Sequence, residues 1–334
     1  MFKYTLHEWI DMDKLKWDSL SENPKAIQLI EENIDKVDWH YLSGNTGAIH
    51  LLEKNPTKIN WRVLSSNPNA IHLLEQNPTK IDWIKLSGNP SAIRLLEKNQ
   101  GKINWSKLSE NPNAIKLLEN NIDKINWSNL SENPNAIQLL ERNIDKIKWS
   151  KLSKNPNAIH LLEQNVKKIN WTHLSQNNNA TQLLAKYPEK IDWKWFALKR
   201  NAMHVIEKNL SKVDYGFLSF NPNAVSFFEK NQEKIDWNKF SSNPNAIHLL
   251  EQNQDKIYWK FLSSNSNAIH LLEQNQDKID WFWLTDNSSL FKEEIDYNVI
   301  TARMNIIREE LMMKCMHPSR LERFLEMGGD IDDF

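Results

Sequence analysis

Residues 127–148 read WSNLSENPNAIQLLERNIDKIK, and residues 149–170 continue with WSKLSKNPNAIHLLEQNVKKIN. Both stretches follow one pattern, W-x-x-L-S-x-N-P-N-A-I-x-L-L-E-x-N-x-x-K-I, in the same register. Self-similarity at a period between about 20 and 50 residues is typical of solenoids and related arrays, in which each unit is buried only by its neighbours. The fold therefore has to be worked out from this repeat.

A tryptophan opens almost every repeat and sets its register. Tyr215 replaces it once, and no insertion breaks the phase. The series gives twelve full units over residues 17–280 and a partial thirteenth. The tryptophans are Trp17, Trp39, Trp61, Trp83, Trp105, Trp127, Trp149, Trp171, Trp193, Trp237, Trp259 and Trp281.

Residues 61–82 show how one unit is expected to fold. Asn67 can cap a helix that starts at Pro68, because proline lacks the N–H that would be orphaned there. Asn77 is expected to end this helix in the left-handed conformation. Asp82 is placed to cap a second, shorter helix. The apolar residues at helical spacing in the first helix are Ala70, Ile71, Leu73 and Leu74.

Each unit is thus predicted to be a small helix pair, and isolated helices shorter than about 12 residues are marginal in water. Stability has to come from stacking, with the recurring Asn, Glu and Lys forming ladders and the tryptophans forming part of the core. Layers about 8–10 Å apart predict a rod or superhelix on the order of 100 Å long. We take it to be right-handed by analogy with other helix-pair arrays. A leucine-rich repeat fits poorly, because its strand signature is absent. The predicted fold is an all-α solenoid.

Both ends of such an array need polar covers. Residues 1–16 are predicted to form an N-terminal cap, residues 17–280 the twelve repeats, and residues 281–334 a partial repeat with a helical C-terminal cap. In the last segment, residues 299–315 are expected to form a long amphipathic helix, and Pro318 to open another.

The amino-acid composition argues against several classes of function. The 42 basic and 43 acidic residues do not favour nucleic-acid binding by the whole chain. The single cysteine, Cys315, excludes an intramolecular disulfide framework and favours a reducing, intracellular setting. No stretch has the pattern of a secretory signal or the roughly 20 apolar residues of a membrane helix. We expect a soluble protein that is neither secreted nor embedded in a membrane.

The unit LSxNPNAIxLLExNxxKIxW resembles the short tandem repeats of uncharacterised proteins of giant DNA viruses that infect amoebae. The tail MHPSRLERFLEMGGDIDDF, residues 316–334, is similar to the closing segment of many such proteins. Its part LERFLEMGGDID also resembles the second helix and turn of an ankyrin repeat, although the units lack the ankyrin TPLH opening. The resemblance implies an ankyrin-like solenoid made during infection, in the host cytoplasm or the virion, that binds other proteins. It brings no catalytic residues.

Six histidines follow NAI or its variants, but they do not predict a metal site. Neighbouring layers would hold them about 8–10 Å apart, whereas the ligands of one zinc each lie about 2 Å from it. No nucleophile with a base, carboxylate pair or glycine-rich phosphate loop stands out, and Cys315 with His317 is interpreted as structural. We predict no enzyme activity and no cofactor. The histidines are His50, His72, His160, His204, His248 and His270.

The functional information should lie where the repeats differ. The second residue after the tryptophan is lysine in several middle units, which predicts an exposed position. Four of its last five occupants are aromatic, and aromatic residues on an accessible face are typical interface anchors. The alternative is that these rings are all buried against neighbouring helices or the C-terminal cap. The predicted partner-binding residues are Trp195, Phe217, Phe261 and Trp283.

Repeats 8 to 10 depart from the pattern. Asn178 and Arg200 replace the proline, and Phe227 and Phe228 replace the leucine pair. Larger core side chains need more room, so an altered curvature is expected here. A hinge or docking site is the alternative.

The function expected from these features is a non-enzymatic scaffold that binds a host or viral protein, as a monomer. A structural component of the virion fits the composition equally well. Nucleic-acid binding through a basic stripe on repeats 4 to 7 is a further alternative, although glutamates occur in every unit. The stripe would consist of Lys85, Arg94, Lys107, Lys116 and Lys151.

Overall fold

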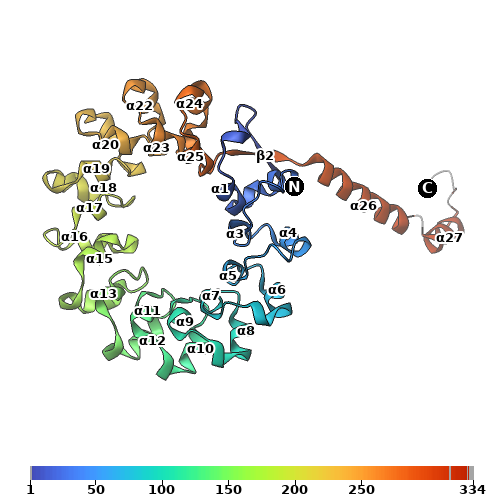
Figure 1. Ribbon diagram of the computed structural model, residues 1–334, viewed down its shortest axis with the longest axis horizontal. Helices are drawn as coiled ribbons and strands as arrows, with labels where there is room; N and C mark the ends of the chain where they lie inside the picture. The colour runs from blue at the N-terminus through green and yellow to red at the C-terminus, as the bar shows by residue number, and fades with distance from the viewer. Residues whose placement is uncertain (1, 316, 329, 331–334) are drawn as a thin grey trace. The chain divides into compact units, whose positions relative to one another are not determined.

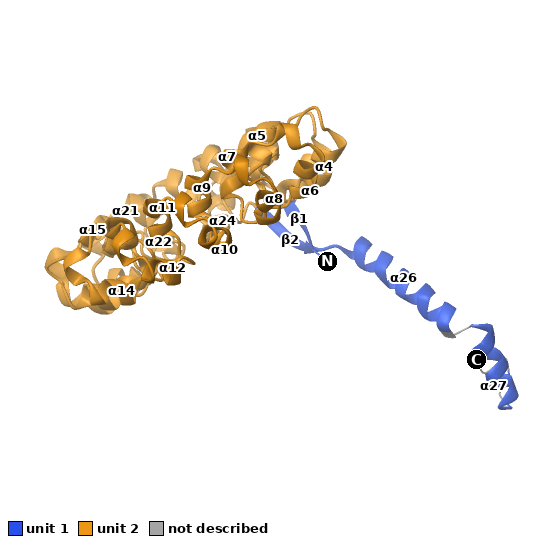
Figure 2. Cartoon of the chain, turned by 90° about the horizontal axis from the view of Figure 1, so that it is seen from below, with its two compact units in different colours: residues 1–7, 291–334 blue, residues 8–290 orange. Residues whose placement is uncertain are grey.

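The computed structural model describes residues 2–315, 317–328 and 330, and it divides into two units. Residues 8–290 form the repeat unit, and residues 1–7 with 291–334 form the terminal unit (Figure 2). The repeat unit consists of short helices in regular pairs, which confirms the predicted all-α solenoid. Residues 8–16 belong with the repeats in this division, whereas the sequence predicted a separate cap over residues 1–16.

One helix of each pair begins at the tryptophan position. Most of these helices have the predicted cap: the Asp82 carboxylate accepts the N–H of Lys85 at 3.0 Å. Figure 1 shows them on the inner side of the circuit that the repeats follow, so we call them the inner helices. They are α1 (Trp17–Glu22), α3 (Trp39–Leu42), α5 (Trp61–Leu64), α7 (Trp83–Gly88), α9 (Trp105–Glu110), α11 (Trp127–Glu132), α13 (Trp149–Leu152), α15 (Trp171–Gln176), α17 (Trp193–Phe196), α19 (Tyr215–Leu218), α21 (Trp237–Phe240), α23 (Trp259–Ser263) and α25 (Trp281–Thr285).

The second helix of each pair lies on the outer side of the circuit (Figure 1). It starts three residues later than predicted: the Asn67 side chain accepts the N–H of Asn69 at 3.0 Å, which forms a turn, and the helix begins only at Ile71. These outer helices are α2 (Ile27–Glu32), α4 (Ile49–Lys54), α6 (Ile71–Gln76), α8 (Ile93–Lys98), α10 (Ile115–Glu119), α12 (Ile137–Glu141), α14 (Ile159–Gln164), α16 (Thr181–Ala185), α18 (Met203–Ile206), α20 (Val225–Glu229), α22 (Ile247–Gln252) and α24 (Ile269–Gln274). In four repeats the turn is a 3-10 helix: Pro24–Ala26, Asn178–Ala180, Pro222–Ala224 and Ser266–Ala268.

The outer helix ends near an asparagine, but not in the predicted left-handed conformation. Asn77 has a φ of −128°, and its side chain donates to the Leu73 carbonyl at 3.0 Å. The amide thereby bonds a carbonyl at the helix end, where intrahelical partners run out. In most repeats a 3-10 helix then leads to the next tryptophan. These 3-10 helices are Met12–Lys14, Pro78–Lys80, Gln100–Lys102, Ile122–Lys124, Ile144–Lys146, Val166–Lys168, Glu207–Lys212, Gln232–Lys234, Gln254–Lys256 and Gln276–Lys278.

Apolar side chains fill the space between the inner and outer helices. Leu130, Ala136 and Leu140 are fully buried in one representative repeat. The tryptophan, predicted as a core residue, is only half-buried. The lysine near the end of the same repeat lies over its ring, with Lys124 Nζ 4.7 Å from the centroid of Trp105. This is within the range of a cation–π interaction, so the recurring lysines lie over the tryptophans of their own repeats.

Two hydrogen-bond ladders run between successive inner helices and the residues beside them. In the serine ladder, Ser109 Oγ accepts the N–H of Asn126 at 3.0 Å. In the asparagine ladder, buried Asn133 donates from Nδ2 to the carbonyls of Ser109 and Asn111, each at 3.1 Å. These bonds satisfy backbone carbonyls in the core, where an unpaired carbonyl is costly. The asparagine ladder was predicted, and the serine ladder was not.

The repeat unit closes on itself. The Lys16 N–H donates to Thr285 Oγ1 at 3.1 Å, which is the serine-ladder bond with threonine in place of serine. Lys14 Nζ lies 4.9 Å from the Trp281 ring centroid, as the lysine near the end of most other repeats lies over the tryptophan that opens the repeat. Residues 8–16 therefore supply the end of a thirteenth repeat. The prediction of an open rod or superhelix is wrong for this unit, whose helices α1 to α25 follow a closed circuit (Figure 1).

The terminal unit contains two strands that the sequence did not predict. Strand β1 (Phe2–Leu6) pairs antiparallel with β2 (Phe291–Ile295), with Phe2 opposite Ile295. The predicted helices follow as α26 (Tyr297–Cys315) and α27 (Pro318–Glu326). Apolar side chains are exposed on more than one side of α26, so the prediction of an amphipathic helix is wrong.

Candidate functional site

The four aromatic residues predicted to bind a partner lie on inner helices and form two pairs. The ring centroids of Trp195 and Phe217 are 6.3 Å apart, and those of Phe261 and Trp283 are 5.9 Å apart. Both pairs have the edge-to-face geometry that aromatic rings prefer. Trp195 is 40% exposed, and the other three residues are partly buried. The rings therefore pack on each other without being removed from solvent.

Lysines lie beside both pairs. Lys194 Nζ is 4.7 Å and Lys239 Nζ 5.5 Å from the ring centroid of Phe217. Lys260 Nζ is 5.7 Å from that of Trp283. Lys239 takes the equivalent position in α21, between the two pairs. We call these five equivalent positions on successive inner helices the aromatic row: Trp195, Phe217, Lys239, Phe261 and Trp283.

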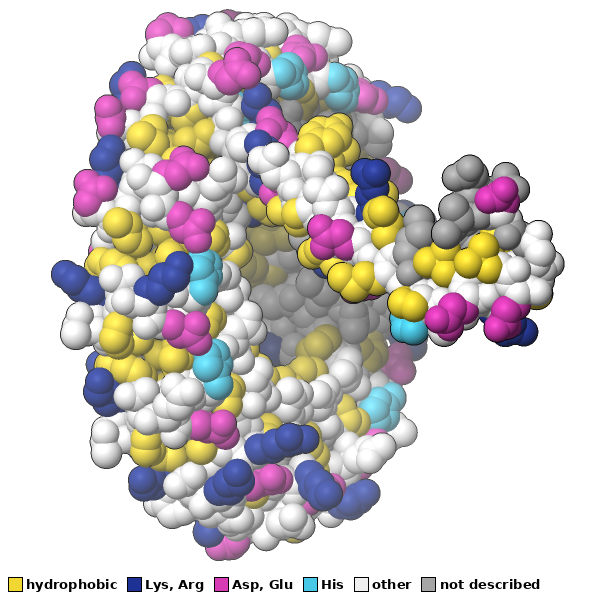
Figure 3. Space-filling model, turned by 90° about the vertical axis from the view of Figure 1, so that its right-hand side faces the viewer, with side chains coloured by type: hydrophobic (Ala, Val, Ile, Leu, Met, Phe, Trp, Pro, Cys, Tyr) yellow, Lys and Arg dark blue, Asp and Glu magenta, His cyan; other side chains and the backbone are white. Residues whose placement is uncertain are grey.

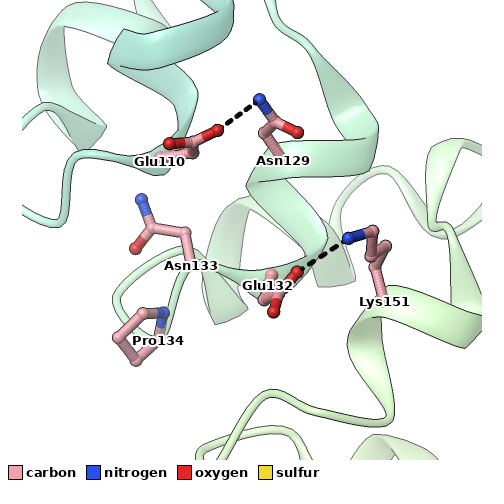
Figure 4. Close-up of a pocket in the computed structure, with 6 residues that line it drawn as sticks. All are labelled: Glu110, Asn129, Glu132, Asn133, Pro134 and Lys151. Atoms are coloured by element: carbon pink, nitrogen blue, oxygen red, sulfur yellow. Dashed lines mark hydrogen bonds and ion pairs between the residues drawn. The ribbon is translucent and has the colours of Figure 1, made fainter. Parts of the chain in front are cut away.

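The position equivalent to the aromatic row is mostly polar in the other repeats of the closed repeat unit. Asn129 Nδ2 donates to Glu110 at 2.8 Å, and Lys151 Nζ lies 3.2 Å from Glu132 (Figure 4). With Asn133 and Pro134 these residues line a cavity of about 310 Å³. Both carboxylates are thus already bonded inside the cavity. The occupants in the first eight repeats are Ser19, Tyr41, Val63, Lys85, Lys107, Asn129, Lys151 and His173.

The five basic residues considered for nucleic-acid binding do not form one stripe. Lys85, Lys107 and Lys151 belong to inner helices. Arg94 and Lys116 belong to the outer helices α8 and α10. Lys107 also forms an ion pair of 2.9 Å with a glutamate of its own helix. The structure thus divides the set between the inner and outer sides of the ring.

The histidine position forms a ladder of its own on the outer helices. His72 Nε2 lies 2.8 Å from a carboxylate oxygen of Glu53 in the preceding repeat. At His204 the corresponding residue is Ala185, which has no carboxylate. Figure 3 shows histidine and acidic side chains next to one another on the face drawn. The other histidines in such pairs are His50, His160, His248 and His270.

One repeat, residues 193–214, interrupts both hydrogen-bond ladders. Lys199 replaces the buried asparagine, is only 3% exposed, and donates from Nζ to the Asn177 carbonyl. Burial lowers the pKa of Lys199 to about 8, because the charged ammonium loses hydration. Ala197 replaces the serine and has no hydroxyl to accept the N–H of Asp214, the last residue of this repeat.

The sequence contained the signal for Lys199, although the residue was not singled out. When the repeats are aligned on their tryptophans, all the units except this one have asparagine at this position, from Asn23 to Asn287. The neighbouring aromatic substitutions fill the core, since Phe228 is fully buried and Phe227 stacks on Tyr215 with the two rings 9° from parallel. The altered curvature expected for repeats 8 to 10 stays a prediction.

Neither a metal-binding cluster nor a membrane-spanning helix occurs in the described part of the chain. No group of three or more histidine, cysteine, aspartate and glutamate side chains is placed there to hold a metal ion. None of the helices described is both long enough and apolar enough to cross a membrane. Comparison with protein-family models, curated proteins and solved structures finds no match.

Proposed function

We propose that the chain is a non-enzymatic scaffold whose aromatic row binds another protein. The observation that supports this most strongly is that the pairs Trp195–Phe217 and Phe261–Trp283 remain partly exposed on inner helices. Large aromatic side chains, tryptophan above all, are enriched among the residues that dominate binding energy at protein interfaces. Apart from Tyr41, the first eight repeats place no phenyl or indole ring at this position. The row therefore marks one arc of the ring.

The lysines beside the row indicate the chemistry of the partner. Lys194 and Lys260 are exposed and lie within cation–π distance of Phe217 and Trp283. Electrostatic complementarity favours a partner whose carboxylates meet these ammonium groups. We propose a segment with apolar anchors between acidic residues, carried by a host or viral protein. The resemblance of the repeats suggests that the encounter takes place inside an infected cell.

Site-specific photo-crosslinking in infected cells tests this proposal. A photoreactive phenylalanine analogue at position 217 should crosslink to the partner. The same analogue at position 107 is the matched control, because it occupies the equivalent place in α9. Equal crosslinking from both positions would show that the aromatic row is not the binding face.

Affinity for the captured partner gives a second measurement. Replacing the four aromatic residues by alanine should weaken binding at least tenfold, because interface anchors typically contribute more than about 1 kcal/mol each. A control with alanine at four equivalent positions of other repeats should bind as the unchanged protein does. The binding variant is W195A/F217A/F261A/W283A, and the control is K85A/K107A/N129A/K151A.

A further inference from the structure

Helix α26 carries an apolar seam with the spacing of a coiled coil. Ile300, Met304, Ile307 and Leu311 recur at alternating intervals of four and three residues. This spacing places the side chains along one line of the helix, as the a and d positions of a heptad do. All four are exposed, Ile307 by 56% and Leu311 by 61%. An exposed apolar row of this length is typical of an association surface.

The charges beside the seam indicate what covers it. Taking Met304 as an a position makes Ile307 a d position, and Arg303 and Glu310 then both occupy g positions. In an antiparallel pair of helices g positions face each other, so Arg303 of each copy would meet Glu310 of the other. In a parallel pair, g faces e, and Arg303 would meet the like charge of Arg308. The helix is therefore complementary to a reversed copy of itself.

We propose that two copies of the chain associate through antiparallel pairing of their α26 helices. The register that pairs the g positions also places Met304 opposite Ile307 and Ile300 opposite Leu311. The apolar residues of the seam and the charges beside it thus support the same alignment of the two helices. Lys314 takes the next seam position and limits the seam to four layers.

A second apolar stripe on α26 does not offer an equivalent surface. Val299, Ile306 and Met313 recur only once every seven residues. The positions between them are taken by Arg303 and Glu310, so this stripe lacks the alternate core residue that a continuous coiled-coil seam needs. This contrast assigns the pairing to the first seam.

The oligomeric state of the full chain tests the pairing. Sedimentation equilibrium over a range of concentrations should show a mass that rises from 39.4 kDa toward that of two copies. Ile307→Asp should hold the protein at 39.4 kDa, and because Ile307 is exposed the thermal midpoint of the ring should not change. A single copy at every concentration, or a limiting mass other than two copies, would overturn the proposal.

Charge exchange tests the register. Arg303→Glu or Glu310→Arg alone should weaken dimerisation at least tenfold, because each creates two like-charge contacts in a symmetric pair. The double variant R303E/E310R should restore it, since the contacts are again complementary. Glu309→Arg is the matched control, because Glu309 lies at f, away from the seam, and should leave the dimer unchanged. Failure of the double variant to restore dimerisation would reject this register.

The only cysteine of the chain reports the helix direction. With a rise of about 1.5 Å per residue, an antiparallel pair in this register places the two copies of residue 315 about 30 Å apart. A parallel pair would place them roughly 10 Å apart, one helix-packing distance. Spin labels on Cys315, measured by pulsed electron resonance, should give the longer distance, and the shorter one would overturn the antiparallel arrangement.

Discussion

The Lys16 N–H donates to Thr285 Oγ1 at 3.1 Å and joins the residue that precedes α1 to the last inner helix, α25. The same bond occurs in the middle of the array, where the N–H of Lys148, which precedes α13, lies 3.0 Å from Ser131 Oγ in α11. The two ends therefore meet as any two adjacent repeats do. An open solenoid must cover its terminal apolar faces with capping repeats. Here closure removes that need, because the first and thirteenth repeats cover each other.

Removing the hydroxyl at this junction should loosen it locally. Thr285→Val keeps the shape of the side chain but leaves the Lys16 N–H without its acceptor. We expect a loss of about 1 kcal/mol in the free energy of opening. In hydrogen exchange measured by mass spectrometry, residues 11–25 and 281–290 should exchange faster.

The control for this variant is the same bond inside the array. Ser131→Ala should cause a similar loss, but with faster exchange only near residues 127–150. If Thr285→Val left exchange at residues 11–25 unchanged, the junction would not be an equivalent repeat contact.

Lys199→Asn should stabilise the ring at neutral pH. Lys199 has a pKa of about 8 in the folded protein, whereas a lysine of the unfolded chain has its ordinary pKa of 10.5. At pH 7 both states carry the proton, and the folded state bears the cost of burying the charge. The pKa difference corresponds to about 3 kcal/mol, which the variant should recover in part or in full while it restores the asparagine ladder.

The pH dependence of this effect has a definite sign. Between about pH 8 and 10.5 the folded state loses the Lys199 proton while the unfolded state keeps it. Because the unfolded state then binds more protons, the contribution of Lys199 to stability rises with pH across this window. The advantage of Lys199→Asn in urea denaturation should therefore shrink from pH 7 to pH 10. Lys212→Asn, at an exposed position, should change stability by less than about 0.5 kcal/mol at either pH.

Ala197→Ser should repair the serine ladder two residues away. The new hydroxyl can accept the N–H of Asp214, as the serine does at other junctions. We expect a gain of about 1 kcal/mol in the urea denaturation of the ring. Ser219→Ala, which removes the existing bond to Asp236 at the next junction, should cost about as much. A destabilising Ala197→Ser would show that the site has closed around the methyl group.

Much of the repeat unit follows from its sequence, because the signals for it are local. The tryptophan spacing gives the period, and Asp82 caps the inner helix as its position predicts. Closure of the repeat unit could not be predicted from such local signals. It depends on the sum of small rotations between repeats, which no single repeat encodes, and Thr285 looks in the sequence like a decayed serine. The strand pairing of Phe2 with Ile295 was equally hidden, because it joins residues from the two ends of the chain.

The candidate site was likewise predicted only in part. Lysine at positions 85, 107 and 151 predicted that the equivalent Trp195 would be accessible, and 40% of it is exposed. The edge-to-face contact with Phe217 was not predicted, because it depends on ring orientation across a repeat boundary. Helical spacing alone also failed for α26, where two apolar stripes at different angles were taken for one amphipathic face.

The two polar ladders should differ sharply in their contribution to stability. Asn133 is almost fully buried, and its amide pairs the carbonyls of Ser109 and Asn111. Asn133→Ala would remove both of these bonds and the one that its Oδ1 accepts from the Asn135 N–H, so we expect a loss of about 3 kcal/mol. His160 and Glu141 also lie 2.8 Å apart, but both side chains are about half exposed. Exposed pairs of this kind contribute roughly 0 to 1 kcal/mol, because water competes for both partners.

Urea denaturation of Asn133→Ala and His160→Ala at pH 7 compares the two directly. The first variant should unfold at a clearly lower urea concentration and the second close to that of the unchanged protein. Both changes truncate a polar side chain that bonds to the preceding repeat, so the difference reports burial together with the number of bonds lost. Equal losses would mean that water reaches the asparagine ladder as readily as the histidine ladder, and that the repeats are held together by their apolar core alone.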